Sequence, residues 1–180
     1  MCSLGWHVVA TDTRAVLSSV LQHNIDSNRH NLPEGSGTIQ TRELDWTVDP
    51  ARWTWSHPTV IASHDYTDSD TPTDTLHPPF DLILTADTLY SPQLVRPLLR
   101  VLHALTVTHS TPIYLALERR DPHLIDDALQ QAHELWSFSV QRVPHKKVTK
   151  ALVRAGCRWN RVDWEGVEIW KLVLRSMSSL

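Results

Sequence analysis

The sequence predicts an α/β fold with a mainly parallel sheet. Short apolar runs rich in β-branched residues alternate with segments whose apolar residues recur at helical spacing. Polar turn residues separate these runs. The last two apolar runs, 137–143 and 166–174, have no strong helical segment between them, so we expect a long antiparallel hairpin. The length of 180 residues suits a single domain that covers the whole chain, 1–180.

The first strand is expected at 7–11, the run HVVAT, directly before Asp12. A helix follows at 13–28, because its apolar residues fall on one face that would pack on the sheet. These residues are Val16, Leu17, Val20, Leu21 and Ile25. The turn PEGSG then leads into a second strand at 38–44.

The middle of the chain predicts a loop, a strand and a helix. Residues 62–79 are polar and rich in proline, so we expect a flexible loop within the domain and no domain boundary. A third strand is expected at 80–86. The helix at 91–107 has Ser91 as its expected N-cap, and Pro97 should kink this helix or delay its start.

A fourth strand is expected at 112–118, and the helix at 121–136 should begin with Asp121 as its N-cap. Strands and helices thus alternate up to the final pair of strands. This order favours parallel strands joined by helical crossovers.

The composition argues against several classes of function. The net charge is -3, so no overall basic balance points to nucleic acid. No run reaches the roughly 18 apolar residues that a membrane span needs. The two cysteines, Cys2 and Cys157, provide neither a disulfide framework nor a zinc site, and they suit a reducing compartment. We expect no metal.

Acidic residues stand at the ends of four of the predicted strands: Asp12, Asp45 and Asp87 follow three of them, and a fourth ends on Glu118. In open α/β sheets, ligands bind beyond the carboxyl ends of the strands. Any one such acid is more often the cap of the next helix. Four in succession favour a binding site, because a carboxylate can accept hydrogen bonds from both hydroxyls of a ribose.

Two of these acids have an aromatic neighbour. Trp46 follows Asp45 directly, and Tyr90 lies three residues after Asp87. An indole ring can stack on an adenine base, which stabilises binding by roughly 1–3 kcal/mol. The alternative for Trp46, an ordinary core or surface tryptophan, is equally compatible with the sequence.

The segments VVATD, RELDWT, DLILTADTLYSP, YLALERRD and GVEIWKL together resemble the seven-β-strand lysine methyltransferases of the methyltransferase-like group. Their order and spacing match this family from Gly5 to Leu174, and the branch of methyltransferase-like protein 22 is the most similar. The resemblance implies a Rossmann-like sheet and transfer of a methyl group from S-adenosyl-L-methionine to a protein lysine. ADTLY and VEIWKL are its most specific segments.

The resemblance also implies roles for individual residues. Asp12 matches the acid that holds the ribose of the cofactor, and Asp45 and Trp46 match the pair at its adenine. Ala86 matches the strand end beside the reacting methyl group. Asp87 and Tyr90 match the D-x-x-Y pattern, which would line the entry for the lysine amine.

The chemistry fits these residue types. Methyl transfer from sulfur is an in-line displacement, so positioning of the reactants dominates catalysis. The lysine must arrive as a neutral amine, and desolvation in a partly apolar channel lowers the pKa of an amine. A carboxylate and a phenol can orient it, although the carboxylate alone would raise that pKa.

The family begins with a strand, a glycine-rich loop and a helix that have no counterpart here. The G-x-G at Gly35 and Gly37 precedes a strand, so it is interpreted as a turn, and glycine is scarce, at 5 residues of 180. We therefore expect an N-terminally truncated domain with little affinity for the cofactor. The strands at 7–11 and 80–86 would then either pair directly or leave a slot about one strand wide.

A second interpretation belongs to another class of function. The chain would be a non-catalytic methyltransferase remnant that binds a protein partner, with Trp53, Trp55, Trp159 and Trp164 as exposed anchors. For the enzyme, the resemblance implies a protein substrate, no direct contact with nucleic acid or membrane, and a location in the nucleus or cytoplasm. The substrate protein and the oligomeric state stay open.

Overall fold

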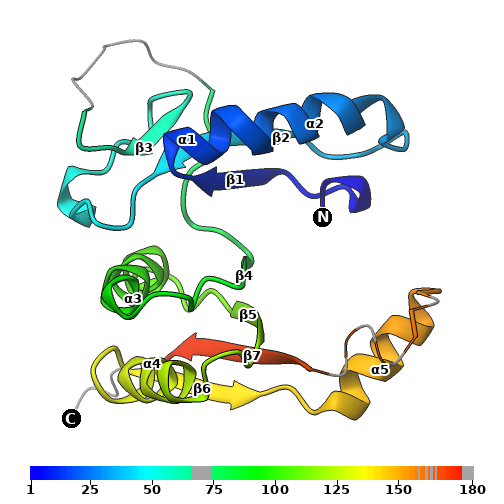
Figure 1. Cartoon of the computed structure of the whole chain (residues 1–180). Coiled ribbons are helices and arrows are strands. Elements are labelled where there is room, and N and C mark those ends of the chain that lie inside the picture. The colour runs from blue at the N-terminus through cyan, green and yellow to red at the C-terminus, as the bar shows by residue number, and fades with distance from the viewer. Residues whose placement is uncertain (66–73, 158, 161, 163, 165, 176–180) are drawn as a thin grey trace. The chain divides into compact units, whose positions relative to one another are not determined.

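The computed structural model of the protein describes residues 1–65, 74–157, 159–160, 162, 164 and 166–175. They form two compact units, Met1–Pro78 and Pro79–Leu180, and each is described by itself. Strands and helices alternate in both units, with parallel and antiparallel strands (Figure 1). This arrangement confirms the predicted α/β class and is consistent with a Rossmann-like methyltransferase fold.

The first unit contains a three-stranded parallel sheet in the order β1-β2-β3. Its elements are β1 (Val8–Asp12), α1 (Arg14–Val16), the π-helical segment η2 (Leu17–Leu21), α2 (Gln22–Asn28), β2 (Ile39–Leu44) and β3 (Val60–Ala62). Single 3-10 turns lie at η1 (Cys2–Leu4), η3 (Arg29–Asn31) and η4 (Pro50–Arg52). In the register of the first pair, Val8 lies opposite Ile39 and Asp12 opposite Glu43.

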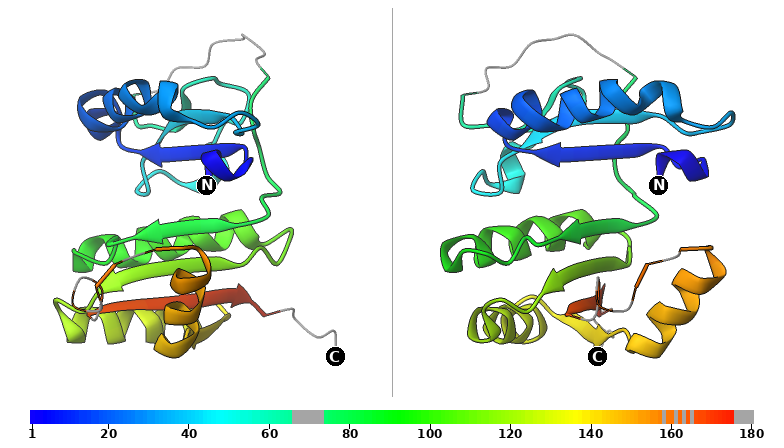
Figure 2. Two further views of the ribbon diagram at one scale, coloured as in Figure 1. Left: turned by 90° about the vertical axis from the view of Figure 1, so that its right-hand side faces the viewer. Right: turned by 45° about the vertical axis from the view of Figure 1, so that its right-hand side comes forward.

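The helical segment from α1 to α2 lies along this sheet, as Figure 2 shows, but it buries little apolar surface. Leu17, Leu21 and Ile25 are half-buried, whereas Val16 and Val20 are exposed. Two polar contacts join the helical segment to β2. Arg14 pairs with Glu43, and the Thr41 hydroxyl donates to the Gln22 amide oxygen at 3.0 Å. The predicted helix therefore forms, but it packs partly through polar contacts.

The core of the first unit includes β3, which the sequence did not predict. All three residues of β3, Val60, Ile61 and Ala62, are buried together with Leu44 and Val48. A run of three residues is too short to show a strand period. Part of the predicted loop 62–79 lies outside the described residues, namely 66–73; the rest of it beyond Ala62 contains no helix or strand among the residues described.

The second unit contains a four-stranded sheet in the order β4-β5-β7-β6. Its elements are β4 (Ile83–Ala86), α3 (Pro92–Thr106), β5 (Ile113–Glu118), α4 (Pro122–Glu134), β6 (Phe138–Arg142), α5 (His145–Arg154) and β7 (Val167–Leu174). β4 and β5 are parallel, and β7 is antiparallel to both β5 and β6. The C-terminal antiparallel pair is thus confirmed.

The connection between β6 and β7 differs from the prediction, because it contains the ten-residue helix α5. α5 buries no residue fully, although Val148, Ala151 and Leu152 recur at helical spacing in its sequence. Gly156, in the left-handed region at φ 72°, ends it. Pro144 before the helix and Gly156 after it were the available signals.

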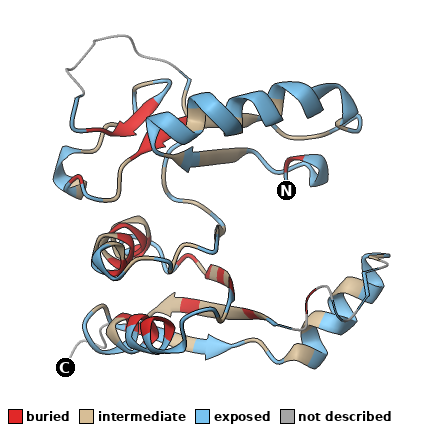
Figure 3. Cartoon of the chain, in the orientation of Figure 1, coloured by how far each residue is buried: buried red, intermediate tan, exposed pale blue. Residues whose placement is uncertain are grey.

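The core of the second unit is formed by the two helices that the sequence predicted and by strand residues such as Ile113 and Phe138 (Figure 3). α3 buries Val95, Leu98, Leu99, Val101 and Leu102, and α4 buries Leu124, Ile125, Ala128, Leu129 and Ala132. Asp121 caps α4 as predicted, because its Oδ1 accepts the Leu124 N–H at 3.1 Å. Ser91 occupies the N-cap position of α3 without a capping bond, and α3 begins before Pro97 and continues through it.

β1 and β4 belong to different sheets, and each is an edge strand of its own sheet among the described residues. The direct pairing of these two strands, which the sequence left open, stays a prediction.

Candidate functional site

The carboxyl edge of the first sheet brings Asp12 and Asp45 to neighbouring strand ends. Asp12 is the last residue of β1 and pairs in register with Glu43, two residues before Asp45. The Oδ1 atom of Asp12 accepts the Thr13 N–H at 2.7 Å. The side chain is half-buried, so it is held at the edge of the sheet and remains accessible to solvent.

Asp45 organises the turn that follows β2. Its Oδ1 atom accepts the Thr47 N–H at 2.8 Å and the Thr47 hydroxyl at 2.7 Å. The Thr47 oxygen also lies 2.9 Å from His64 Nε2. Because the Thr47 hydroxyl has a single proton and uses it on Asp45, His64 Nε2 must be the donor in this second bond. Trp46, inside the turn, is half-buried.

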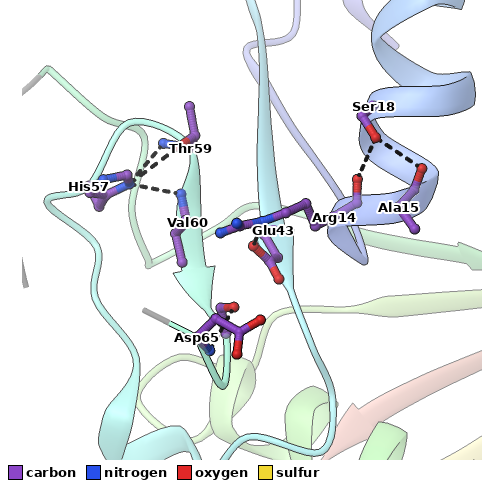
Figure 4. Close-up of polar contacts among 9 residues, drawn as sticks. Arg14, Ala15, Ser18, Glu43, His57, Thr59, Val60 and Asp65 are labelled. Atoms are coloured by element: carbon purple, nitrogen blue, oxygen red, sulfur yellow. Dashed lines mark hydrogen bonds and ion pairs between the residues drawn. The ribbon is translucent and has the colours of Figure 1, made fainter. Parts of the chain in front are cut away.

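Figure 4 shows the polar contacts on either side of β2 near this turn. Arg14 Nε donates to Glu43 Oε2 at 3.0 Å, and the Glu43 side chain is only 11% exposed. His57 Nδ1 accepts the N–H groups of Thr59 at 3.2 Å and Val60 at 3.1 Å, so its ring proton must lie on Nε2. These bonds fix the entry into β3 beside the end of β2.

Arg42 is the residue of this region that sequence reasoning missed. It is fully buried in β2, and burial lowers the pKa of its guanidinium. Its terminal nitrogens donate to the backbone carbonyls of Leu76 at 2.9 Å, Trp55 at 2.9 Å and His57 at 2.7 Å. The Arg42 side chain therefore connects two loops to β2, namely the loop that contains Trp55 and His57 and the loop that contains Leu76.

At the edge of the second sheet, Asp87 follows β4 in a conformation that is unusual for a residue other than glycine. Its φ is 50°, in the left-handed region, which aspartate tolerates better than most residues. Its N–H donates to Ala116 O at 2.9 Å, and its Oδ1 accepts the Glu118 N–H at 3.3 Å. Asp87 is thus anchored to β5 by its backbone and by one carboxylate oxygen, while its side chain is exposed.

Ala86 and Tyr90 lie on either side of Asp87. Ala86 pairs in register with Ala116 at the end of β4 and is exposed. Tyr90 is 67% exposed, in the connection to α3. A hydrogen bond of 2.8 Å from Thr85 Oγ1 to Thr88 Oγ1 braces the turn between them.

Two charged residues, Glu118 and Arg120, lie beside Asp87 at this edge of the sheet. Neither residue was assigned a specific role from the sequence. Glu118 ends β5 and pairs with Arg120 at 2.8 Å. The hydrogen bond that Arg120 donates to Glu118, with smaller contributions from the charges of Glu118 and Asp87, raises the pKa of Arg120. The Asp87 carboxylate therefore lies near the Arg120 guanidinium.

Glu168 of β7 has more charged partners than any other described carboxylate of the second unit. Arg119 donates to both of its oxygens at 3.1 Å, Trp170 Nε1 donates at 2.9 Å, and Arg142 lies 3.0 Å away. Burial alone would raise the pKa of Glu168, but these hydrogen bonds and positive charges outweigh it and hold the pKa below its usual value. Through Arg119, which directly follows β5, these contacts connect the end of β5 to β7.

The four tryptophans that the non-catalytic alternative requires as exposed anchors differ in their exposure. Trp164 is buried and stacks on His145, with ring centroids 4.3 Å apart, so its prediction as an exposed anchor is wrong. Trp53 and Trp55 are half-buried and pack edge to face, and the Arg42 guanidinium lies over the Trp55 ring. Trp159 is 64% exposed.

No group of three or more histidine, cysteine or acidic side chains in the described part of the chain is placed to hold a metal ion. No helix among the residues described is long and apolar enough to cross a membrane.

Residues 59–132 match the family model described as lysine methyltransferase. The match covers less than half of the chain and runs from the start of β3 into α4. It includes Ala86, Asp87 and Tyr90, whereas Asp12, Asp45 and Trp46 lie before it. A comparison with curated proteins finds no match.

Proposed function

We propose that the chain is an S-adenosyl-L-methionine-dependent methyltransferase domain that acts on protein lysine side chains, and that both units belong to this one domain. The observation that carries the proposal is the similarity of residues 59–132 to lysine methyltransferases. Within that similarity lies the anchored strand end formed by β4, Asp87 and Tyr90. We further propose that the branch of methyltransferase-like protein 22 is the most similar.

The acids at the edge of the first sheet suit a nucleoside. In the proposal, Asp12 holds the ribose, because a carboxylate accepts hydrogen bonds from vicinal hydroxyls. Its second oxygen is the one available for this role, since Oδ1 accepts the Thr13 N–H. Trp46 supplies an aromatic face for the adenine, and Asp45 holds Trp46 in place through the turn at Thr47.

The residues after β4 suit the positioning of an amine. When bound, the cofactor supplies a methyl group activated by a sulfonium sulfur. Asp87 orients the incoming amine by accepting a hydrogen bond from it, and the backbone contacts to β5 keep that carboxylate in place. Tyr90 offers a hydroxyl within the same short loop. Ala86 leaves room at the strand end, because its side chain is a single methyl group.

The substrate, compartment and alternative function are part of the same proposal. A protein lysine is the expected acceptor, and the nucleus or cytoplasm is the expected location. Two free cysteines suit such reducing compartments. The exposure of Trp159 favours, as a second candidate, a non-catalytic domain that binds a protein partner.

A binding titration and a methyl-transfer assay separate these candidates. Calorimetric titration with S-adenosyl-L-methionine should give only a weak heat signal, in keeping with the low affinity expected from the sequence, and Asp12→Ala should weaken it further. Transfer of labelled methyl groups to lysine-containing protein fractions should depend on Asp87. Cofactor binding without any transfer, or no binding at all, would favour the non-catalytic alternative.

A further inference from the structure

Helix α5 leaves the second sheet at the edge that carries Asp87. β5 and β6 are both antiparallel to β7, and β4 is parallel to β5. The carboxyl ends of β4, β5 and β6 therefore lie at one edge of this sheet. α5 follows the carboxyl end of β6, as Figure 2 shows, and Asp87 and Glu118 stand at the ends of β4 and β5.

The charge of α5 contrasts with that of the rest of the chain. The helix, HKKVTKALVR, contains four basic residues and no acidic residue. These are Lys146, Lys147, Lys150 and Arg154. The whole chain has a net charge of -3, so the residues outside α5 have a net charge of -7, because -3 minus +4 is -7. The positive charge of this helix is therefore local.

A groove of about 620 Å³ runs along α5 and the segment after it. Two of its lining residues are basic, Lys146 and Lys150, and others are apolar, among them Leu152, Val153 and Trp159. Val153 is 69% exposed and Trp159 is 64% exposed. Exposed aromatic and aliphatic side chains beside cationic ones are characteristic of protein-recognition surfaces.

The wall of the groove is held by stacked rings. His145 and Trp164 stack at 4.3 Å with an angle of 8° between their planes, and both line the groove. Trp164 is buried, so this wall is fixed by packing. A fixed wall beside the exposed Trp159 ring suits the insertion of one apolar side chain.

We propose that this groove binds an acidic segment of the protein substrate, with one aromatic or aliphatic side chain as its anchor. The inference rests on the proposed function and adds a class of substrate to it. The carboxylates of such a segment complement Lys146 and Lys150, and the anchor fills the apolar part of the groove. Docking at this edge of the sheet would hold the substrate on the side of the unit where Asp87 lies.

A protein segment suits the groove better than a nucleic acid does. Nucleic acid binding draws most of its affinity from many phosphate contacts along a continuous basic track. Among the described residues that line this groove two are lysines, and much of the remaining described lining is apolar. That composition matches side-chain anchoring with charge complementarity at the rim.

Fluorescence anisotropy with a defined probe tests the proposal. The probe is a labelled synthetic peptide of glutamate and glycine with one central phenylalanine, and a second peptide has serine in place of the phenylalanine. The full 180-residue chain should bind the first peptide more tightly. The double variant Lys146→Glu, Lys150→Glu should weaken binding by about tenfold or more, and Trp159→Ala by about tenfold.

The same helix provides a matched control. Lys147→Glu, Arg154→Glu reverses two charges on α5 at positions that do not line the groove, so binding should change by less than about threefold. Equal weakening by both double variants would overturn the proposal, because it would show attraction by the overall charge of the helix. Tighter binding of a single-stranded oligonucleotide than of the peptide would also overturn it.

The peptide assay requires neither cofactor nor turnover, so it separates this inference from the proposed function. Methyl transfer without selective binding of the acidic peptide would refute the groove alone. Selective peptide binding without cofactor binding would refute the enzyme and leave the groove as a docking site.

Discussion

The conformation of a single residue, Asp87, determines how its role can be tested. At φ 50° an alanine would be strained, whereas asparagine tolerates the left-handed region and keeps an oxygen for the Glu118 N–H. Asp87→Asn therefore removes the charge and preserves the fold of the turn.

We expect Asp87→Asn to lower the turnover number by about a hundredfold, as loss of a positioning group does. The melting temperature should stay close to that of the wild type. Asp12→Ala should instead raise the Michaelis constant for S-adenosyl-L-methionine, because Asp12 is assigned to the ribose. Steady-state kinetics of both variants checks this assignment, and an exchange of the two effects would contradict it.

Glu168 should contribute to stability through its charge. Its pKa is held below that of the unfolded chain, which for glutamate is about 4.3. Glu168→Gln should lower the free energy of unfolding by about 2 kcal/mol at pH 7. A lowered pKa means that the charge stabilises the fold above pH about 4.3 and loses this effect as the pH falls through the native pKa.

The difference between the wild type and Glu168→Gln should therefore shrink below pH about 4.3 in urea denaturation. Glu118→Gln is the control, because its ion pair with Arg120 is exposed and should contribute under about 1 kcal/mol. A difference that stays constant from pH 7 to pH 3 would assign the effect of Glu168 to packing.

At the scale of an element, α3 contains a testable local conflict. Pro97 lies inside this helix and has no N–H for the carbonyl of Gln93, four residues earlier. The helix persists because its apolar face is buried, including Val95, Leu98 and Leu99. Packing thus overrides the local preference of proline.

Pro97→Ala should raise the free energy of unfolding by about 1–3 kcal/mol, because it restores the missing hydrogen bond. Pro92→Ala is the control, since the first position of a helix suits proline and needs no such bond. Urea denaturation of both variants measures the difference. A loss of stability in Pro97→Ala would show that packing of the proline ring outweighs the bond.

At the scale of the whole molecule, each sheet has an edge strand next to its predicted site, and such edges promote association. In β4, Leu84 is 53% exposed on this edge strand. We expect the purified chain to self-associate with rising concentration in sedimentation velocity. Leu84→Lys should reduce the association, because a charged side chain on an edge strand disfavours pairing.

Val107→Lys tests whether edge pairing is the cause. Val107 is 58% exposed just after α3 and lies outside any strand. The substitution Val107→Lys should therefore leave the self-association unchanged. Equal relief by both substitutions would point to general hydrophobicity, and a chain that stays monomeric at all concentrations would contradict the prediction.

The sequence by itself determined the features whose causes are local. The periodicity of apolar residues predicted the principal strands and the α3 and α4 helices, because that periodicity depends only on backbone geometry. Asp121 was recognisable as a cap from its position before Pro122. The acids Asp12, Asp45 and Asp87 were predicted at strand ends because each follows a predicted strand directly.

Only the tertiary structure decided the features that depend on distant partners. Arg42 reads as a surface residue in its strand, yet the carbonyls of Trp55, His57 and Leu76 surround its guanidinium. β3 is too short for a periodic signal and exists because it pairs with β2. Trp164 is buried because His145, nineteen positions earlier in the chain, stacks on it. Contacts between residues far apart in the chain carry no local pattern, so the sequence could not predict them.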